Sequence, residues 1–219
     1  MAGDGNVHAD HENGVMSLRY ALLALLTARP LSAYDIAKQF GTSVGFVWYA
    51  PDSQIYPQLR QMEEEGLVAA TEMPSEGRRT KREYRITDEG VRQFRDWIND
   101  PGVYQRERDT HRLRAAYLEW ARPQAAREHM ERHIEFHQEQ IEQWSAVRAA
   151  ILDRSDPTLA ARLDSSSPEQ HERIIAFKAF AYDGLIERAR TEIAWAERGL
   201  ELVDKFAADP TPTPVQRRA

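Results

Sequence analysis

The sequence predicts a mainly α-helical protein with an N-terminal winged helix-turn-helix domain, a two-stranded wing and an all-helical C-terminal dimerisation domain. Three observations carry this prediction. A short helix with a polar face, over residues 53–65, is followed at once by two strand-like segments joined by a basic loop. Apolar residues recur at steps of three and four beyond residue 101. The chain of 219 residues has no cysteine and no apolar run near the roughly 20 residues that span a bilayer.

Composition limits the classes of protein that fit this chain. With 42% hydrophobic residues and no cysteine, it can bury one or two cores and suits a reducing compartment, so we expect a soluble, cytoplasmic protein with no membrane partner. A net charge of −6 disfavours a protein that coats nucleic acid without selectivity. It is compatible with a site-specific DNA binder, because salt screens charges beyond about 10 Å and the local field decides.

The chain is predicted to divide into two domains and two tails. Residues 1–14 and 209–219 are polar or proline-rich and are expected to be disordered. Residues 15–100 are predicted to form the DNA-binding domain, and residues 101–208 the helical dimerisation and effector domain. The boundary is marked by Asn99-Asp100-Pro101-Gly102, a run typical of turns.

The first domain opens with two predicted helices. Ser17 can cap a helix that Pro30 ends, and Ser32 can start a second helix that reaches Phe40. Tyr34, at the start of the second helix, either hydrogen-bonds a DNA phosphate or seals the junction between the helices. The apolar side chains of the first helix, which we expect in a three-helix core, are Leu18, Leu22, Leu25 and Leu26.

Residues 53–65 are the predicted recognition helix. Ser53 is expected to cap this helix and Gly66 to end it, while Pro57 lies at the edge of the first turn, where a missing N–H is tolerated. The side chains expected to face the core are Ile55, Leu59 and Met62. The side chains predicted to contact DNA are Ser53, Gln54, Tyr56, Pro57, Gln58, Arg60 and Gln61.

The wing is predicted from residues 67–71 and 83–87, which have strand character and are separated by the turn residues 74–77. From Arg78 to Arg85 the chain has five basic residues and one acidic residue, a local charge of about +4. An isolated basic run is usually a solvated loop, but after a capped helix it favours DNA contact. The wing residues predicted to contact DNA are Arg78, Arg79, Thr80, Lys81, Arg82 and Tyr84.

A fourth helix is predicted to start at Thr87 and to end at the domain boundary. Aromatic residues gather in the sequence on both sides of this boundary. They either wall a pocket for a planar small-molecule effector or fill the core between the domains, and both interpretations remain open. These residues are Trp97, Tyr104, Tyr117 and Trp120.

The second half of the chain is predicted to be wholly helical, with one helix face from Leu113 to Trp120, a helix opened by Pro123, and a last helix beginning near Ser167-Pro168. The last helix repeats apolar residues at alternating steps of four and three over four heptads, which is typical of a coiled-coil seam. We therefore predict a homodimer. The predicted seam residues are Ile175, Tyr182, Ile186, Ile193, Leu200 and Val203.

The chain contains none of the sequence motifs that accompany nucleophilic, nucleotide-binding or zinc-protease chemistry, so we predict that it is not an enzyme and needs no cofactor. His129, His133 and His137 share one helical stripe, and two of them could hold a zinc ion. The sequence offers no obvious fixed carboxylate to complete such a site. We therefore interpret the row as satisfied or solvated and predict no metal site.

Several motifs resemble those of the PadR family of bacterial transcriptional regulators. They are the segments at residues 18–26, 33–36, 53–59 and 82–90, and the combination of Ile55-Tyr56-Pro57 with the later Tyr84-x-Ile86-Thr87-x-x-Gly90 is specific. The resemblance covers residues 16 to about 98. The helical second half is similar, more loosely, to the longer PadR subgroup, whose C-terminal helices dimerise.

The resemblance implies a dimeric repressor that binds an inverted-repeat operator in double-stranded DNA and is released by a small molecule, phenolic acids being the best-known inducers. It places the recognition helix at Ser53 to Glu65 and the wing at Arg78 to Tyr84. Gln54 stands where the family often has Gly or Ser, which leaves the operator sequence open. The alternative function is a helical adaptor whose winged helix binds protein; it would lack operator selectivity.

Overall fold

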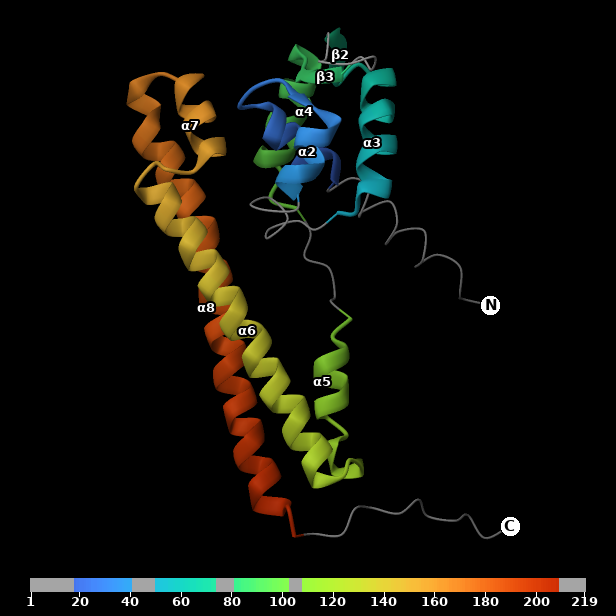
Figure 1. Cartoon of the computed structure of the whole chain (residues 1–219), viewed down its shortest axis with the longest axis vertical. Coiled ribbons are helices and arrows are strands. Elements are labelled where there is room, and N and C mark those ends of the chain that lie inside the picture. The colour runs from blue at the N-terminus through green and yellow to red at the C-terminus, as the bar shows by residue number, and fades with distance from the viewer. Residues whose placement is uncertain (1–17, 41–49, 74–80, 103–107, 209–219) are drawn as a thin grey trace, which may run out of the picture. The chain divides into compact units, whose positions relative to one another are not determined.

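The structure, a computed structural model, describes residues 18–40, 50–73, 81–102 and 108–208. The chain is mainly helical with one small antiparallel sheet (Figure 1), as predicted. It divides into two compact units. The first unit consists of Met1–Gly102 and Asp153–Ile175, and the second of Val103–Leu152 and Ala176–Ala219.

The first unit has a helical core. Residues 18–26 form a helix that is followed by β1 (Leu31–Ser32), α2 (Ala33–Phe40) and α3 (Asp52–Glu64). The leucines of the first helix are buried, because they recur on the face that turns toward α2 and α3. The fully buried side chains of this core are Leu22, Leu23, Ile36, Ile55, Leu59, Met62, Leu67 and Val68.

The start of α3 differs from the prediction, while its end agrees with it. Pro51, with an extended backbone and no side-chain hydrogen bond, precedes the helix, so Ser53 is not the cap and lies in the first turn. Pro57 is inside the helix and cannot donate the usual backbone hydrogen bond to the preceding turn. Gly66 follows the last turn with φ of +75°, a left-handed conformation that glycine adopts without strain.

The wing is a hairpin of β2 (Val68–Met73) and β3 (Lys81–Ile86), paired in register from Val68 with Ile86 to Met73 with Lys81. The predicted two-stranded wing is confirmed, and a third strand, β1, which was not predicted, pairs with the other edge of β3, so the sheet order is β1-β3-β2. Two residues are too few to show the alternation by which a strand is predicted from sequence. β3 is therefore the central strand.

Helix α4 (Asp88–Asn99) begins at Thr87, as predicted, because the Thr87 side chain accepts a hydrogen bond of 3.1 Å from the Gly90 N–H. Gly90 lies where the first turn of α4 approaches the sheet. A Cβ atom built at this position would lie 2.2 Å from the Leu67 carbonyl oxygen and 2.9 Å from Ile86 Cγ1. Only glycine allows this close approach without movement of the backbone.

Helix α7 (Pro157–Asp164) belongs to the first unit and was not predicted. Asp156 caps it by accepting a hydrogen bond from the Leu159 N–H, and Leu159 is fully buried. Arg162 donates a hydrogen bond to the Thr27 hydroxyl at 2.5 Å. The Asp-Pro pair is a common helix start, with aspartate as cap and proline in the first turn, and this signal would have revealed α7.

The second unit is built on a pair of long helices. After α5 (Thr110–Ala115) and a short 3-10 helix, η2 (Leu118–Trp120), it contains α6 (Pro123–Leu152) and most of α8 (Pro168–Phe206). The helix face predicted from residue 113 to 120 is thus interrupted. Figure 1 shows α6 and α8 side by side. In the described ranges, no helix is both long and apolar enough to cross a membrane.

Ion pairs at both ends fix α6 and α8 as antiparallel neighbours. Arg127, near the start of α6, pairs with Asp204 near the end of α8, and Arg148, near the end of α6, pairs with Asp183. One stripe of α8 is buried, and it faces α6 because Glu192 within it is bonded to a histidine of α6. The buried residues of this stripe are Ala179, Tyr182, Ile186, Ala189, Glu192 and Ala196.

This packing changes the interpretation of the predicted coiled-coil seam. Tyr182 and Ile186 are only 7% and 6% exposed, so they are already covered within one chain. The other four seam residues, Ile175, Ile193, Leu200 and Val203, are half-buried. A repeat of four and three residues indicates an apolar helix face, but it does not tell whether the facing helix comes from the same chain.

Candidate nucleic-acid interface

Helix α3 presents a polar face to solvent and an apolar face to the core. Ile55, Leu59 and Met62 are buried, as predicted. Gln58 was expected on the polar face but is only 4% exposed, because it follows Ile55 by three residues and turns inward with it. The predicted DNA-contacting side chains of α3 that are exposed are Ser53, Gln54, Tyr56, Pro57, Arg60 and Gln61.

Two tyrosines extend this polar face. Tyr34 of α2 is 69% exposed and Tyr56 of α3 is 41% exposed. A ring that seals a helix junction would be buried, so the exposure of Tyr34 favours the alternative in which its hydroxyl is available to a phosphate. Helices α2 and α3 pack against each other and form the helix-turn-helix.

The described wing residues are tied to the helices by ion pairs. Lys81 Nζ lies 2.9 Å from Asp35 Oδ2 in α2, and Arg82 Nη2 donates to both carboxylate oxygens of Glu63 in α3, at 2.7 and 2.8 Å. Hydrogen bonds from Ser32 and Lys81 hold the pKa of Asp35 below its ordinary value. These exposed pairs contribute little stability, but they orient β3 relative to α2 and α3.

Tyr84 is a correction to the predicted DNA contacts. Its side chain is only 4% exposed, because β3 is the central strand and residue 84 points into the core. The predicted contacts at Arg78, Arg79 and Thr80 lie outside the described residues.

The acidic end of α3 is largely neutralised. Glu63 pairs with Arg82, and Glu65 pairs with Arg19 at 2.8 Å. Arg60, which points to solvent, makes no ion pair with any described residue. The helix therefore offers one uncommitted guanidinium, and arginine can pair with guanine or with phosphate.

The structure does not gather the predicted effector residues in a described cavity. Trp97, in the first unit, stacks on Tyr20 with ring centroids 4.6 Å apart. Tyr117 and Trp120, in the second unit, are 59% and 48% exposed, and Tyr104 lies outside the described residues.

A cavity of about 650 Å³ does lie in the second unit. Its wall is mainly apolar and includes small residues, which is why a search for aromatic clusters in the sequence missed it. The lining residues are Ala115, Leu118, Glu119, Ala121, Pro123, Ala126, Met130, Trp195, Arg198, Gly199, Leu202, Val203, Phe206 and Ala207.

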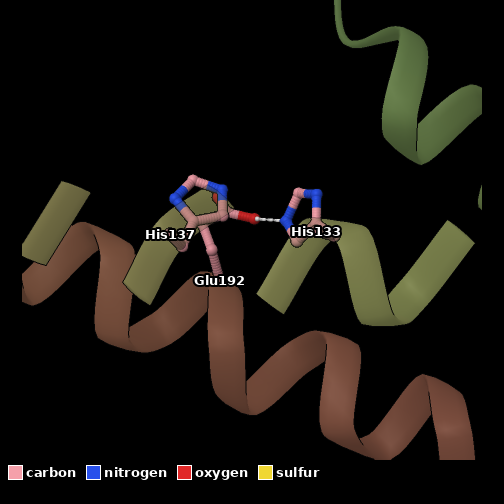
Figure 2. Close-up of side chains that lie close together, drawn as sticks. All are labelled: His133, His137 and Glu192. Carbon is pink, nitrogen blue, oxygen red and sulfur yellow. Dashed lines mark hydrogen bonds and ion pairs between the residues drawn. The ribbon is translucent and has the colours of Figure 1, made fainter. Parts of the chain in front are cut away.

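The histidine row of α6 meets a carboxylate that the sequence did not reveal. His133 Nε2 is joined by a hydrogen bond of 3.1 Å to Glu192 Oε2 of α8, with His137 one turn along (Figure 2). Both Glu192 oxygens also accept hydrogen bonds of 2.8 Å from Arg112. The partner was missed because Glu192 is 59 residues away in the sequence.

Burial and hydrogen bonds shift the pKa values of three groups in this cluster. Burial, aided by the neighbouring His111, lowers the pKa of His129, and burial with His133 nearby lowers the pKa of His137. Burial also raises the pKa of Glu192, but the hydrogen bonds from Arg112 and His133 outweigh it and the pKa is lowered. At neutral pH the cluster therefore combines neutral imidazoles of His129 and His137 with an ionised carboxylate.

Comparison with known proteins shows which proteins this chain resembles in sequence and in fold. Residues 22–96 match the transcriptional regulator PadR-like family. The negative transcriptional regulator PadR of Bacillus subtilis is 26% identical over 189 residues, which are 86% of this chain and 98% of that protein. The structure of Bacillus subtilis PadR with operator DNA has a TM-score of 0.68 and 24% identity, covering 85% of this chain and 97% of that one. The structure with p-coumaric acid has a TM-score of 0.60 and 25% identity, covering 87% and 97%.

The fold and the matched sequence define the class first: the chain has a winged-helix fold with a long helical C-terminal region, and it is similar to transcriptional regulators of the PadR type. The family similarity follows, because residues 22–96 match the model of the PadR-like family of transcriptional regulators. The resemblance predicted from the sequence motifs is confirmed. The relatives are regulators and not enzymes, which is consistent with the predicted absence of catalysis.

Proposed function

We propose that the chain is a repressor that binds an inverted-repeat operator as a homodimer, with α3 in the major groove. The observation that carries the proposal is the solvent-exposed first part of α3, with Ser53, Gln54 and Tyr56 beside the uncommitted Arg60. Bacillus subtilis PadR is a negative regulator and has been solved with operator DNA, which supports the same role here.

The physical basis is the geometry of recognition helices. Residues near the N-terminal end of such a helix contact base edges, and the helix N-terminus attracts phosphate. Glutamine pairs well with adenine, and arginine with guanine. We therefore propose that Gln54 and Arg60 contact the base edges and determine the preferred DNA sequence. Lys81 and Arg82 orient the wing through their ion pairs, and Arg78 and Arg79 are proposed to contact the backbone phosphates.

The test is a fluorescence-anisotropy titration with DNA from upstream of the protein's own gene, at two salt concentrations and with unrelated competitor DNA. Tyr56→Ala and Arg60→Ala are each expected to weaken operator binding by about 1–3 kcal/mol, roughly 5- to 150-fold, because each removes one contact. Arg132→Ala, which removes an exposed guanidinium from α6, is the matched control and is expected to bind like the unaltered protein.

The result also separates the two functions considered from the sequence. Unchanged operator affinity in both α3 variants would contradict the proposal that α3 is the recognition helix. Binding no better than to competitor, together with a tight protein partner in pull-downs, would favour the adaptor.

We also propose that the homodimer forms through the apolar surface that the second unit leaves uncovered. Phe177 and Phe180 on α8 are 69% and 70% exposed, and Phe136 on α6 is 56% exposed. Exposed aromatic groups of this size are typical of interfaces. Phe180→Ser is expected to raise the dimer dissociation constant at least about tenfold in sedimentation equilibrium. Tyr34→Ser, an equally exposed ring in the first unit, is the control; equal effects would contradict this interface.

The proposed effector is a planar aromatic acid bound in the cavity of the second unit. A volume of about 650 Å³ suits a small ligand, and Bacillus subtilis PadR has been solved with p-coumaric acid. Trp195 lines the cavity, so p-coumarate is expected to quench its fluorescence and to weaken DNA binding. Loss of the quenching in Trp195→Phe would show that the fluorescence change comes from Trp195. A ligand that changes neither the fluorescence nor the DNA affinity would contradict the proposal.

A further inference from the structure

We propose that His133, His137 and Glu192 form a binding site for a divalent transition-metal ion of the zinc class, within the second unit. One ligand atom from each of the three side chains lies within 4.8 Å of the other two. His133 and His137 come from consecutive turns of α6, and Glu192 comes from α8 (Figure 2). His133 and Glu192 are each 7% exposed, so the site is enclosed.

The spacing is close to what a zinc ion requires. Zinc bonds to nitrogen and oxygen of about 2.0–2.2 Å, at tetrahedral angles, put the ligand atoms about 3.3–3.6 Å apart. His133 Nε2 and Glu192 Oε2 are 3.1 Å apart, and the rings of His133 and His137 have centroids 4.5 Å apart. The three ligand atoms lie within 4.8 Å of one another, so binding an ion requires them to move somewhat closer together. Two histidines at i and i+4 on a helix are a known zinc-binding arrangement.

Unpartnered nitrogen atoms are an independent observation at the same place. His137 Nδ1 and His129 Nε2 are buried and have no hydrogen-bond partner among the described residues. Buried polar atoms in proteins are almost always paired, so these two orphans call for an explanation. A bound cation supplies one, because it accepts a lone pair where no donor is present.

Further side chains can complete the coordination or orient the ligands. The His111 ring lies 5.3 Å from the His133 ring and 5.7 Å from the His129 ring, so either His111 or His129 is a candidate fourth ligand. Arg112 holds both oxygens of Glu192 and fixes the carboxylate, as partners of metal ligands usually do. Its positive charge also opposes a bound cation, which sets a limit on affinity.

The donor set indicates which ions fit. Two imidazoles and one carboxylate suit zinc and its first-row neighbours, whereas calcium and magnesium prefer oxygen ligands alone. An ion held by two residues of α6 and one of α8 would join the two long helices of the unit. Binding to the folded protein alone would raise its melting temperature.

The test is isothermal titration of zinc into the full chain, prepared without an affinity tag and treated with chelator. All measurements use a His8→Gln/His11→Gln background, so that the histidines near the N-terminus do not contribute. We expect one zinc ion per chain, a higher melting temperature with zinc, and affinity at least about tenfold lower in His137→Gln. His171→Gln is the matched control, because His171 lies in the first unit near the Leu163 carbonyl.

A second variant, Glu192→Gln, and a second ion, cobalt, test the same metal site independently. Glu192→Gln retains the shape of the side chain and is also expected to weaken zinc binding, with circular dichroism confirming that each variant is folded. Cobalt should give the visible bands of tetrahedral coordination in the parent protein and lose them in His137→Gln. Absence of binding at micromolar zinc, or equal affinity in parent, His137→Gln and Glu192→Gln, would overturn the proposal. The measurement needs no DNA and is independent of the proposed operator binding.

Discussion

The first unit buries long aliphatic side chains contributed by several helices and a sheet, whereas the second unit buries a mixture of alanines and larger side chains between two long helices. Leu59 and Met62 are fully buried in the first, while Ala189 and Ala196 fill equivalent depths in the second. The second unit also buries a histidine and a glutamate, and it leaves several phenylalanines exposed. The first unit therefore buries its apolar core within one chain. The second unit leaves large apolar side chains exposed, and these are available to a partner.

The largest expected effect comes from the same substitution made in both units. Leu59→Ala is expected to lower the free energy of unfolding by about 2–5 kcal/mol, because it leaves a cavity in a fully buried site. Leu113→Ala in α5, where the side chain is 62% exposed, is expected to change it by no more than about 0.5 kcal/mol. Urea unfolding followed by circular dichroism measures both. Similar losses would erase the contrast between the units.

Substitution of one glycine in each unit by alanine is expected to change the free energy of unfolding in opposite directions. Gly90→Ala is expected to destabilise the first unit by about 1–3 kcal/mol or more, since the new methyl group would meet the Leu67 carbonyl oxygen. Gly184→Ala in α8 meets nothing within 4 Å and is expected to stabilise by about 0.5–1 kcal/mol, as alanine does within helices. Thermal unfolding of the two variants tests this, and a stable Gly90→Ala protein would contradict the close approach of α4.

The smallest expected effect concerns the surface of the first unit under acid conditions. The pKa of Asp35 is lower in the folded state than its unfolded value of about 4, so its contribution to stability is present above that pH and is lost as the pH falls through the folded pKa. Asp35→Asn should therefore lower the melting temperature slightly at pH near 7 and make it less sensitive to acid below about pH 4. Glu201→Gln, an exposed change in α8, is the control. Identical acid sensitivity in Asp35→Asn and the parent would count against this role.

Local signals explain how much of the first unit was predictable. The cap at Thr87, the left-handed Gly66 and the inward face of α3 depend on residues within one or two turns, and all three agree with the structure. Burial of Gln58 and Tyr84 was missed for different reasons. Gln58 is polar at an inward position, and Tyr84 is buried in the core formed by the helices and strands of the first unit, which a local sequence pattern does not reveal.

Contacts between distant residues explain why less of the second unit was predictable. The apolar repeat of α8 correctly indicated one buried helix face, but its partner proved to be α6 of the same chain. The histidine row was visible in the sequence, yet its carboxylate partner, Glu192, becomes apparent only when α6 and α8 pair as antiparallel neighbours. The cavity was hidden because small and aliphatic residues form much of its wall.

The position of α7 has a consequence for dissecting the protein. Since residues 153–175 group with the first unit, the polypeptide passes from one unit to the other three times, after Gly102, Leu152 and Ile175. A gene fragment that stops near codon 100 would omit the buried Leu159 and the hydrogen bond from Arg162 to Thr27. We expect this fragment to give more folded, soluble protein when residues 153–175 are co-expressed with it or fused to it through a designed linker. This complementation assay needs neither DNA nor ligand.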